Sequence, residues 1–91
     1  MKKFNELTSE LTLVDFFATW CGPCKMIAPV LEQLEGIDVI KVDVDEEREL
    51  AIKYQISSVP TLMLMKNKEI ISTKLGYHSL EELNEWINQF K

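Results

Sequence analysis

Two cysteines separated by two residues are the side chains in this sequence best suited to chemistry. Cys21 and Cys24 are the only cysteines in the chain, and they lie in the stretch Trp20-Cys21-Gly22-Pro23-Cys24. An apolar run from Leu13 to Ala18 precedes them, and a stretch with helical spacing of apolar residues, Lys25 to Leu34, follows them. Both thiols are therefore expected at a turn from a strand into a helix.

This position would activate one of the two sulfurs. At the beginning of a helix, the Cys21 sulfur would face unpaired backbone N–H groups and the positive end of the helix dipole, and both favour thiolate over thiol. The thiolate is the nucleophilic form. Cys24 would lie one turn further on the same face, with the two Cα atoms roughly 5 to 6 Å apart, which suits a disulfide. Pro23 fits a first helical turn, and Gly22 would leave Cys21 open to a partner. The spacing favours an exposed attacking sulfur and a shielded resolving sulfur.

Two other uses of this spacing are weaker. A zinc site needs about four ligands, and the chain offers only two cysteines and one histidine, His78. An inert structural disulfide would close so small a loop that it would restrict the unfolded chain very little. The residues therefore favour a redox-active pair with no bound metal.

The segment from Val14 to Pro29, VDFFATWCGPCKMIAP, resembles the thioredoxin family throughout. The similarity continues through Lys41-Val42-Asp43, Val59-Pro60-Thr61 and Gly76, and it covers nearly the whole chain after about residue 11. The resemblance implies an α/β thioredoxin fold, with a mixed sheet of four to five strands flanked by helices on both faces. We expect residues 1–91 to form a single thioredoxin domain of this kind.

The resemblance also implies a thiol–disulfide oxidoreductase that reduces protein disulfides through a Cys21/Cys24 dithiol–disulfide cycle. No cofactor is implied other than this redox-active disulfide. The implied partners are disulfide-containing protein substrates and an NADPH-dependent flavoprotein, thioredoxin reductase. The Gly22-Pro23 pair is similar to that of reducing members of the family. An alternative of a different class is a non-catalytic thioredoxin-fold binding subunit of a larger complex, and another is metal or cluster binding by two chains that share their cysteines.

Asp15 interrupts the apolar run before the cysteines, and we expect it to be buried there. Burial without a partner would raise its pKa, which makes it a candidate proton acceptor for Cys24. The thioredoxin family carries an Asp in the matching position with this proposed role. Lys41, in a strand predicted from Ile37 to Val44, could be a surface lysine with a buried stem. The resemblance instead pairs Lys41 with Asp15.

The resemblance places a cis peptide bond before Pro60, packed against the disulfide, whereas the residues alone predict only a proline at a strand start. A cis proline would leave the Val59 backbone free to bind a substrate peptide as an added strand. Tyr77 is larger than the residue usual in the family at its position. The docking face implied by the resemblance comprises Trp20, Gly22, Pro23, Val59, Pro60 and Gly76.

The first and last helices can also be placed. The spacing predicts a short helix over about residues 3–10, and the family's usual first strand is expected to be missing or vestigial, because only 20 residues precede Cys21. Gly36 is expected to cap the helix after Cys24, and Ser79 with Glu82 form a capping box for the last helix.

The middle of the chain predicts a helix followed by a hairpin. The acidic run 45–47 is expected to open the helix. Gln55 falls where this helix should stop, and a left-handed glutamine there would cost roughly 1 kcal/mol. Two strands, Thr61–Met65 and Ile70–Leu75, are predicted to form a hairpin with Asn67 at a positive φ in its turn.

Composition limits the classes of partner. The net charge of −5 argues against nucleic-acid binding, which requires clustered Lys and Arg. No apolar stretch approaches the roughly 20 residues of a membrane span, and Glu6, Glu10 and Asp15 interrupt any signal-peptide core. We expect a cytoplasmic monomer with no nucleic-acid or membrane partner.

Overall fold

The structure, a computed structural model, describes residues 4, 7 and 10–91. The helix predicted over residues 3–10 lies largely outside the described residues; within it, the Leu7 N–H donates to the Phe4 carbonyl oxygen at 3.2 Å. The elements that follow are β1 (Thr12–Phe17), α1 (Gly22–Glu32), β2 (Asp38–Asp43), α2 (Arg48–Lys53), β3 (Thr61–Lys66), β4 (Glu69–Leu75) and α3 (Leu80–Asn88).

The strands form one mixed sheet with the order β2-β1-β3-β4. Strand β1 is parallel to β2 and antiparallel to β3, and β3 is antiparallel to β4. The parallel pair follows from the crossover helix α1 between its two strands, because a parallel connection must return to the same end of the sheet. The described residues thus form a four-stranded sheet, which confirms the predicted fold class at the lower strand number.

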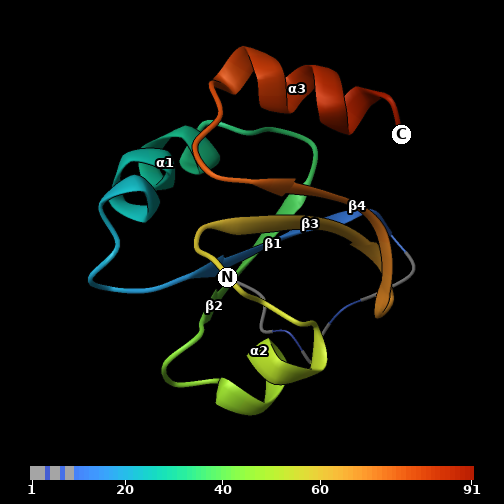
Figure 1. The fold of residues 1–91 in the computed structure, drawn as a ribbon. Coiled ribbons are helices and arrows are strands. Elements are labelled where there is room, and N and C mark those ends of the chain that lie inside the picture. Colours follow the sequence, from blue (N-terminus) through green and yellow to red (C-terminus); the bar gives the residue numbers. More distant parts are fainter. Residues whose placement is uncertain (1–3, 5–6, 8–9) are drawn as a thin grey trace.

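Alternation along β1 divides the core into two layers. Successive side chains of a strand point to opposite faces, so Leu13 packs with α1 and α3 whereas Val14 and Phe16 pack on the other face. Figure 1 shows α1 and α3 on one side of the sheet and α2 on the other. The first layer contains Leu13, Ile27, Leu31, Leu62, Leu64, Leu83, Trp86 and Ile87. The second contains Val14, Phe16, Ile40, Val42, Met63 and Met65, with Leu50 and Tyr54 of the α2 region packed against it.

Two predicted helix boundaries are wrong. Helix α1 ends at Glu32, and tighter bonds from the Gln33 and Leu34 N–H groups close its last turn, so Gly36 does not cap it. Gly36 adopts a φ of 75° in the loop before β2 instead. Helix α2 begins at Arg48 and not at residue 45, because the Asp43 carboxylate accepts hydrogen bonds from the next N–H groups and holds residues 45 and 46 in a turn.

Two other local predictions are confirmed. Ser79 Oγ accepts a hydrogen bond from the Glu82 N–H, and the Glu82 carboxylate accepts one from the Ser79 N–H, both at 3.2 Å. This is a complete capping box at the beginning of α3. Asn67 adopts a φ of 56° in the turn between β3 and β4, which is a conformation that its short polar side chain tolerates.

Helix α2 ends in a Schellman motif built on a residue poorly suited to it. Gln55 has a φ of 56°, its N–H donates to the Ile52 oxygen, and the Ile56 N–H donates to the Ala51 oxygen. Glycine usually occupies this left-handed position because it has no Cβ to collide with the backbone. The predicted end of the helix at Gln55 is therefore confirmed, and its left-handed backbone carries a local conformational cost.

We predict that Gln55→Gly stabilises the protein by about 0.5 to 1 kcal/mol. Relief of the left-handed strain outweighs the extra chain entropy of glycine in the unfolded state. Urea unfolding of the wild-type and variant proteins measures the difference. Gln55→Ala is the matched control, since it shortens the side chain but keeps the strain. An equal gain in both variants would contradict this account.

Candidate functional site

The two cysteines occupy the strand-to-helix turn that the sequence predicts. Cys21 is the N-cap of α1, with an extended backbone (φ −90°, ψ 115°). Its sulfur accepts a hydrogen bond from the Cys24 N–H at 3.1 Å. The two residues form a disulfide across a Cα–Cα distance of 5.2 Å. Because the positive end of the helix dipole lies at this N-terminus and the Cys24 N–H points at the sulfur, this position favours negative charge on the Cys21 sulfur once the disulfide opens.

The prediction of one exposed and one shielded cysteine is wrong for the disulfide form. Cys21 is only 5% exposed and Cys24 is 4% exposed, and both pack with Ala18 in a small buried cluster. Val59 and Val44 lie against the same cluster and cover part of it. The difference between the two sulfurs therefore lies in their polar surroundings and not in their exposed area.

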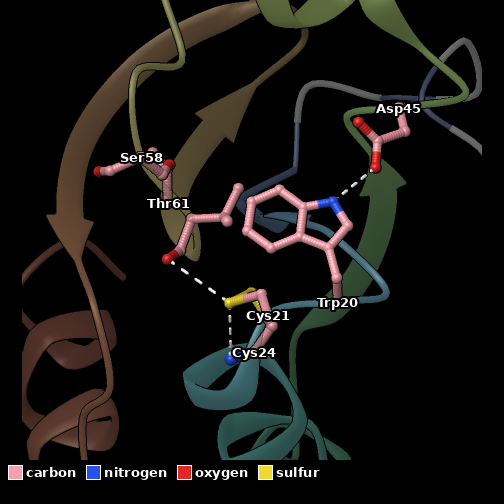
Figure 2. The surroundings of a disulfide bond; sticks show 7 residues. Trp20, Cys21, Cys24, Asp45, Ser58 and Thr61 are labelled. Atoms are coloured by element: carbon pink, nitrogen blue, oxygen red, sulfur yellow. Dashed lines mark hydrogen bonds between the residues drawn. A yellow bond between two sulfur atoms is a disulfide. The ribbon is translucent and has the colours of Figure 1, made fainter.

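A cis peptide bond brings the segment before β3 next to the disulfide. The Val59–Pro60 bond is cis, as the family resemblance implied. The Val59 carbonyl oxygen lies 3.6 Å from the Cys21 sulfur, a contact drawn in Figure 2. The Pro60 carbonyl oxygen accepts a hydrogen bond from the Gly76 N–H at 2.9 Å. Val59 thus contacts Cys21 directly, and Pro60, the next residue, is bonded to Gly76.

The docking residues implied by the resemblance differ in how they reach the surface. Trp20, Gly22 and Pro23 are exposed, and Val59 and Gly76 are half-buried. A Cβ at Gly22 or Gly76 would project into open space, so the absence of a side chain at both positions leaves the surface around the disulfide unobstructed. Pro60 is fully buried. It therefore sets the backbone path and adds no accessible surface for a substrate.

Trp20 is held by a partner that the sequence analysis missed. Its indole N–H donates to the Asp45 carboxylate at 2.9 Å, although its side chain is highly exposed (Figure 2). Asp45 lies 25 residues away in the turn before α2, and the sequence indicates it only as part of the acidic run 45–47. No local pattern links the two residues; only the fold brings them together.

Asp15 is the one buried carboxylate among the described residues without a hydrogen-bond partner. It lies on the same face of β1 as Leu13, which packs against Ile27 of α1. Because α1 returns along β1 in the opposite direction, the step from Leu13 to Asp15 leads toward the turn of α1 that carries Cys24. Burial raises the pKa of Asp15 to about 6, and the charge of Lys41 partly offsets this increase.

Lys41 lies beside Asp15 without forming an ion pair with it. The two residues are directly opposite in the parallel β1–β2 pair, and both oxygens of Asp15 lack a partner. The Lys41 ammonium lies 5.0 Å from the centre of the Phe17 ring, in a cation–π contact. Lys41 is therefore close enough to influence the carboxyl group electrostatically, while its stem lies against an aromatic ring as a half-buried lysine does.

Among residues 10–91, with Phe4 and Leu7, no group of three or more His, Cys, Asp or Glu side chains is placed to hold a metal ion. Across the same residues, no helix has the length and apolar character needed to cross a membrane.

Comparison with known proteins identifies the family. The thioredoxin family model matches residues 1–89. The chain is 46% identical to the thioredoxin of Listeria monocytogenes, with 96% of this chain and 90% of the relative aligned, and 46% identical to that of Bacillus subtilis, with 97% and 90% aligned. The crystal structure of thioredoxin NaTrxh from Nicotiana alata superposes with a TM-score of 0.82 at 33% identity, covering 96% of this chain and 78% of that one.

The chain belongs to the thioredoxin family. It is a thiol–disulfide oxidoreductase with protein-disulfide reductase activity, and Cys21–Cys24 is the redox-active pair. The fold agrees with this membership, since a four-stranded mixed sheet with three helices is the thioredoxin fold.

We predict that Asp15→Asn stabilises this family member at pH 7.5 by about 3 kcal/mol. The folded-state pKa of about 6 exceeds the ordinary 3.8, so the folded protein disfavours the charged form that the unfolded chain adopts freely. The penalty is absent below pH 3.8, grows as the pH rises to about 6, and is constant above that. The gain of the variant, measured by urea unfolding, should therefore shrink toward zero near pH 4. A gain that does not depend on pH would contradict burial of the charged carboxylate.

Proposed function

We propose that Cys21 is the attacking sulfur and Cys24 the resolving sulfur in the reduction of protein disulfides. The observation that supports these roles most strongly is the N-cap position of Cys21, whose sulfur accepts the Cys24 N–H at 3.1 Å. A thiolate at this position receives a hydrogen bond and the favourable field of the helix. Cys24 is buried one turn inside α1 and lacks this position.

The exchange proceeds in two steps. The Cys21 thiolate attacks one sulfur of the substrate disulfide, forms a mixed disulfide, and releases the other substrate sulfur as a thiolate, which takes a proton from solvent. Cys24 then loses its proton, attacks the Cys21 sulfur, and releases the second substrate sulfur. Two electrons have moved to the substrate, and Cys21 and Cys24 are left as the disulfide seen in the structure.

Asp15 is the base that accepts the Cys24 proton in the second step. Its pKa of about 6 means that most of it is a carboxylate at neutral pH, although burial keeps it a better proton acceptor than an exposed Asp. It has no competing hydrogen bond within the described residues. Lys41 acts through Asp15, because its positive charge opposes the increase in the carboxyl pKa and keeps that group ionised.

The substrate docks around Cys21, on the surface between Trp20 and the Val59 and Gly76 backbones. Gly22 and Pro23 are the exposed residues of this surface that follow Cys21 in the chain. Val59 offers its backbone as the edge for an added substrate strand, while Pro60 and its cis bond direct that edge. The open space above Gly22 and Gly76 supports this location, since a side chain at either position would obstruct an incoming peptide.

The partners follow from the chemistry. The Cys21–Cys24 disulfide must be reduced after each turnover, and thioredoxin reductase is the proposed donor. Disulfide-containing proteins are the substrates. We further propose that residues 1–91 act as a single domain and as a cytoplasmic monomer. The net charge of −5 supports solubility without a nucleic-acid partner.

We predict that Cys24→Ser accumulates a covalent complex with a protein disulfide, whereas Cys21→Ser forms none. Without Cys24 the mixed disulfide on Cys21 has no internal thiol to resolve it. Non-reducing electrophoresis after mixing with insulin measures the adduct, and the doubly substituted protein is the control. If full biological activity survived in the double variant, the non-catalytic binding role would replace the reductase role.

We predict that the second step accelerates as the pH rises through about 6, because only the Asp15 carboxylate accepts a proton. Dithiobis(nitrobenzoate) releases one coloured thiolate when Cys21 attacks and another when Cys24 resolves, so stopped-flow absorbance separates the steps. Asp15→Asn should slow the second release by about 10²-fold and remove its dependence near pH 6. An unchanged second release would exclude Asp15 as the base.

A further inference from the structure

Thr61, the first residue of β3, uses its side-chain hydroxyl in a hydrogen bond that is part of neither the strand pairing nor the redox steps. The Thr61 hydroxyl donates to the Ser58 carbonyl oxygen at 2.7 Å, and it reaches back across Val59 and Pro60 to do so. Figure 2 shows Ser58 and Thr61 on the segment opposite the two cysteines. Thr61 is 3% exposed whereas Ser58 is exposed. A buried, fixed side chain therefore anchors a peptide group at the surface.

This anchor determines the direction of one backbone N–H. The Ser58 carbonyl and the Val59 N–H belong to the same peptide unit, and the cis bond of this segment is the next one along the chain. A planar trans unit points its carbonyl and its N–H in opposite directions. Because the Ser58 oxygen is held toward Thr61, the Val59 N–H points away from Thr61.

The other backbone groups of this segment already have defined positions. The Val59 carbonyl oxygen lies against the Cys21 sulfur, the Pro60 carbonyl oxygen accepts the Gly76 N–H, and proline has no N–H to offer. Within the described part of the chain, the Val59 N–H has no hydrogen-bond acceptor. It is therefore the donor that remains for an incoming strand next to Cys21.

We propose that Thr61 is a positioning residue for polypeptide substrates. Its hydroxyl fixes the Ser58–Val59 peptide so that the Val59 N–H donates to a backbone carbonyl of the substrate beside the reacting disulfide. This inference rests on the proposed function, since it requires a substrate docked at Val59. It separates two classes of substrate: extended polypeptides gain from the anchor, whereas small disulfides without a peptide backbone do not.

The test compares Thr61→Val, which keeps the shape of the side chain but removes the hydroxyl, with Thr61→Ser, which keeps the hydroxyl. For insulin reduction we expect Thr61→Val to lower kcat/KM about 3- to 10-fold through an increase in KM. This is the loss expected when one hydrogen bond, from the Val59 N–H to the substrate, is weakened. Its reaction with dithiobis(nitrobenzoate) should stay within about twofold of wild type, and Thr61→Ser should match wild type with both substrates.

Three outcomes would overturn the proposal. Equal losses with insulin and the small disulfide would show a general structural role, and no loss with either would show that the anchor is not needed. A Thr61→Ser protein as impaired as Thr61→Val would show that the hydroxyl is not the active group. Failure of the wild-type protein to reduce either substrate would instead contradict the proposed function itself.

A second measurement tests the proposal without substituting Thr61. In the Cys24→Ser protein trapped with a disulfide-bonded peptide, hydrogen exchange at the Val59 N–H should slow at least about tenfold relative to the free protein. The Gly76 N–H, already bonded to Pro60, is the internal control and should change little. An unprotected Val59 N–H in the trapped complex would show that it does not bind the substrate, and the proposal would fall.

Discussion

The hydrogen bond from the Cys24 N–H to the Cys21 sulfur is the interaction on which the rest of the site depends. It places the sulfur at the N-terminus of α1, next to the positive end of the helix dipole. Every other feature of the site acts on a sulfur that is already held there. The Val59 carbonyl oxygen also contacts it, so the sulfur lies between the N-terminus of α1 and the segment that receives the substrate in the proposed function.

The second requirement of the proposed mechanism is a proton acceptor inside the protein, and Asp15 of the sheet would supply it at a cost in stability. Asp15 lies in the middle of a central strand with both oxygens unpaired. A protein selected for stability alone would place an apolar residue there. The parallel register puts Lys41 directly opposite Asp15. Its charge opposes the increase in the Asp15 pKa, but the two side chains do not form an ion pair. The site thus combines a buried sulfur at a helix N-terminus with a buried carboxylate, the base in the proposed mechanism.

The sequence predicted most of this arrangement because its strongest signals are local. The spacing of Cys21 and Cys24, the apolar run before them and the helical pattern after them defined the turn without knowledge of the fold. Asp15 could be identified because a carboxylate inside an apolar run is unusual. The capping box at Ser79, the helix end at Gln55 and the positive φ of Asn67 also depend on adjacent residues only, and the structure confirms them.

What the sequence did not predict depends on contacts between distant segments or on competition between neighbours. The bond from Trp20 to Asp45 joins two loops that only the sheet brings together. Helix α1 ends before Gly36 because the Gln33 and Leu34 N–H groups close its last turn. Helix α2 begins late because the Asp45 N–H donates to the Asp43 carboxylate. Val44 and Val59, both distant in sequence, pack against the two buried cysteines. The cis bond before Pro60 is expected only from the family resemblance.

The most direct test of the account is the rate at which each reduced thiol reacts with iodoacetamide at pH 7, followed by mass spectrometry of the labelled peptides. If the start of α1 stabilises the Cys21 thiolate, Cys21 should be labelled at least about tenfold faster than Cys24 and faster than a free cysteine. Labelling of both thiols at the same slow rate as free cysteine would show that the helix start does not activate Cys21, and the proposed mechanism would fail.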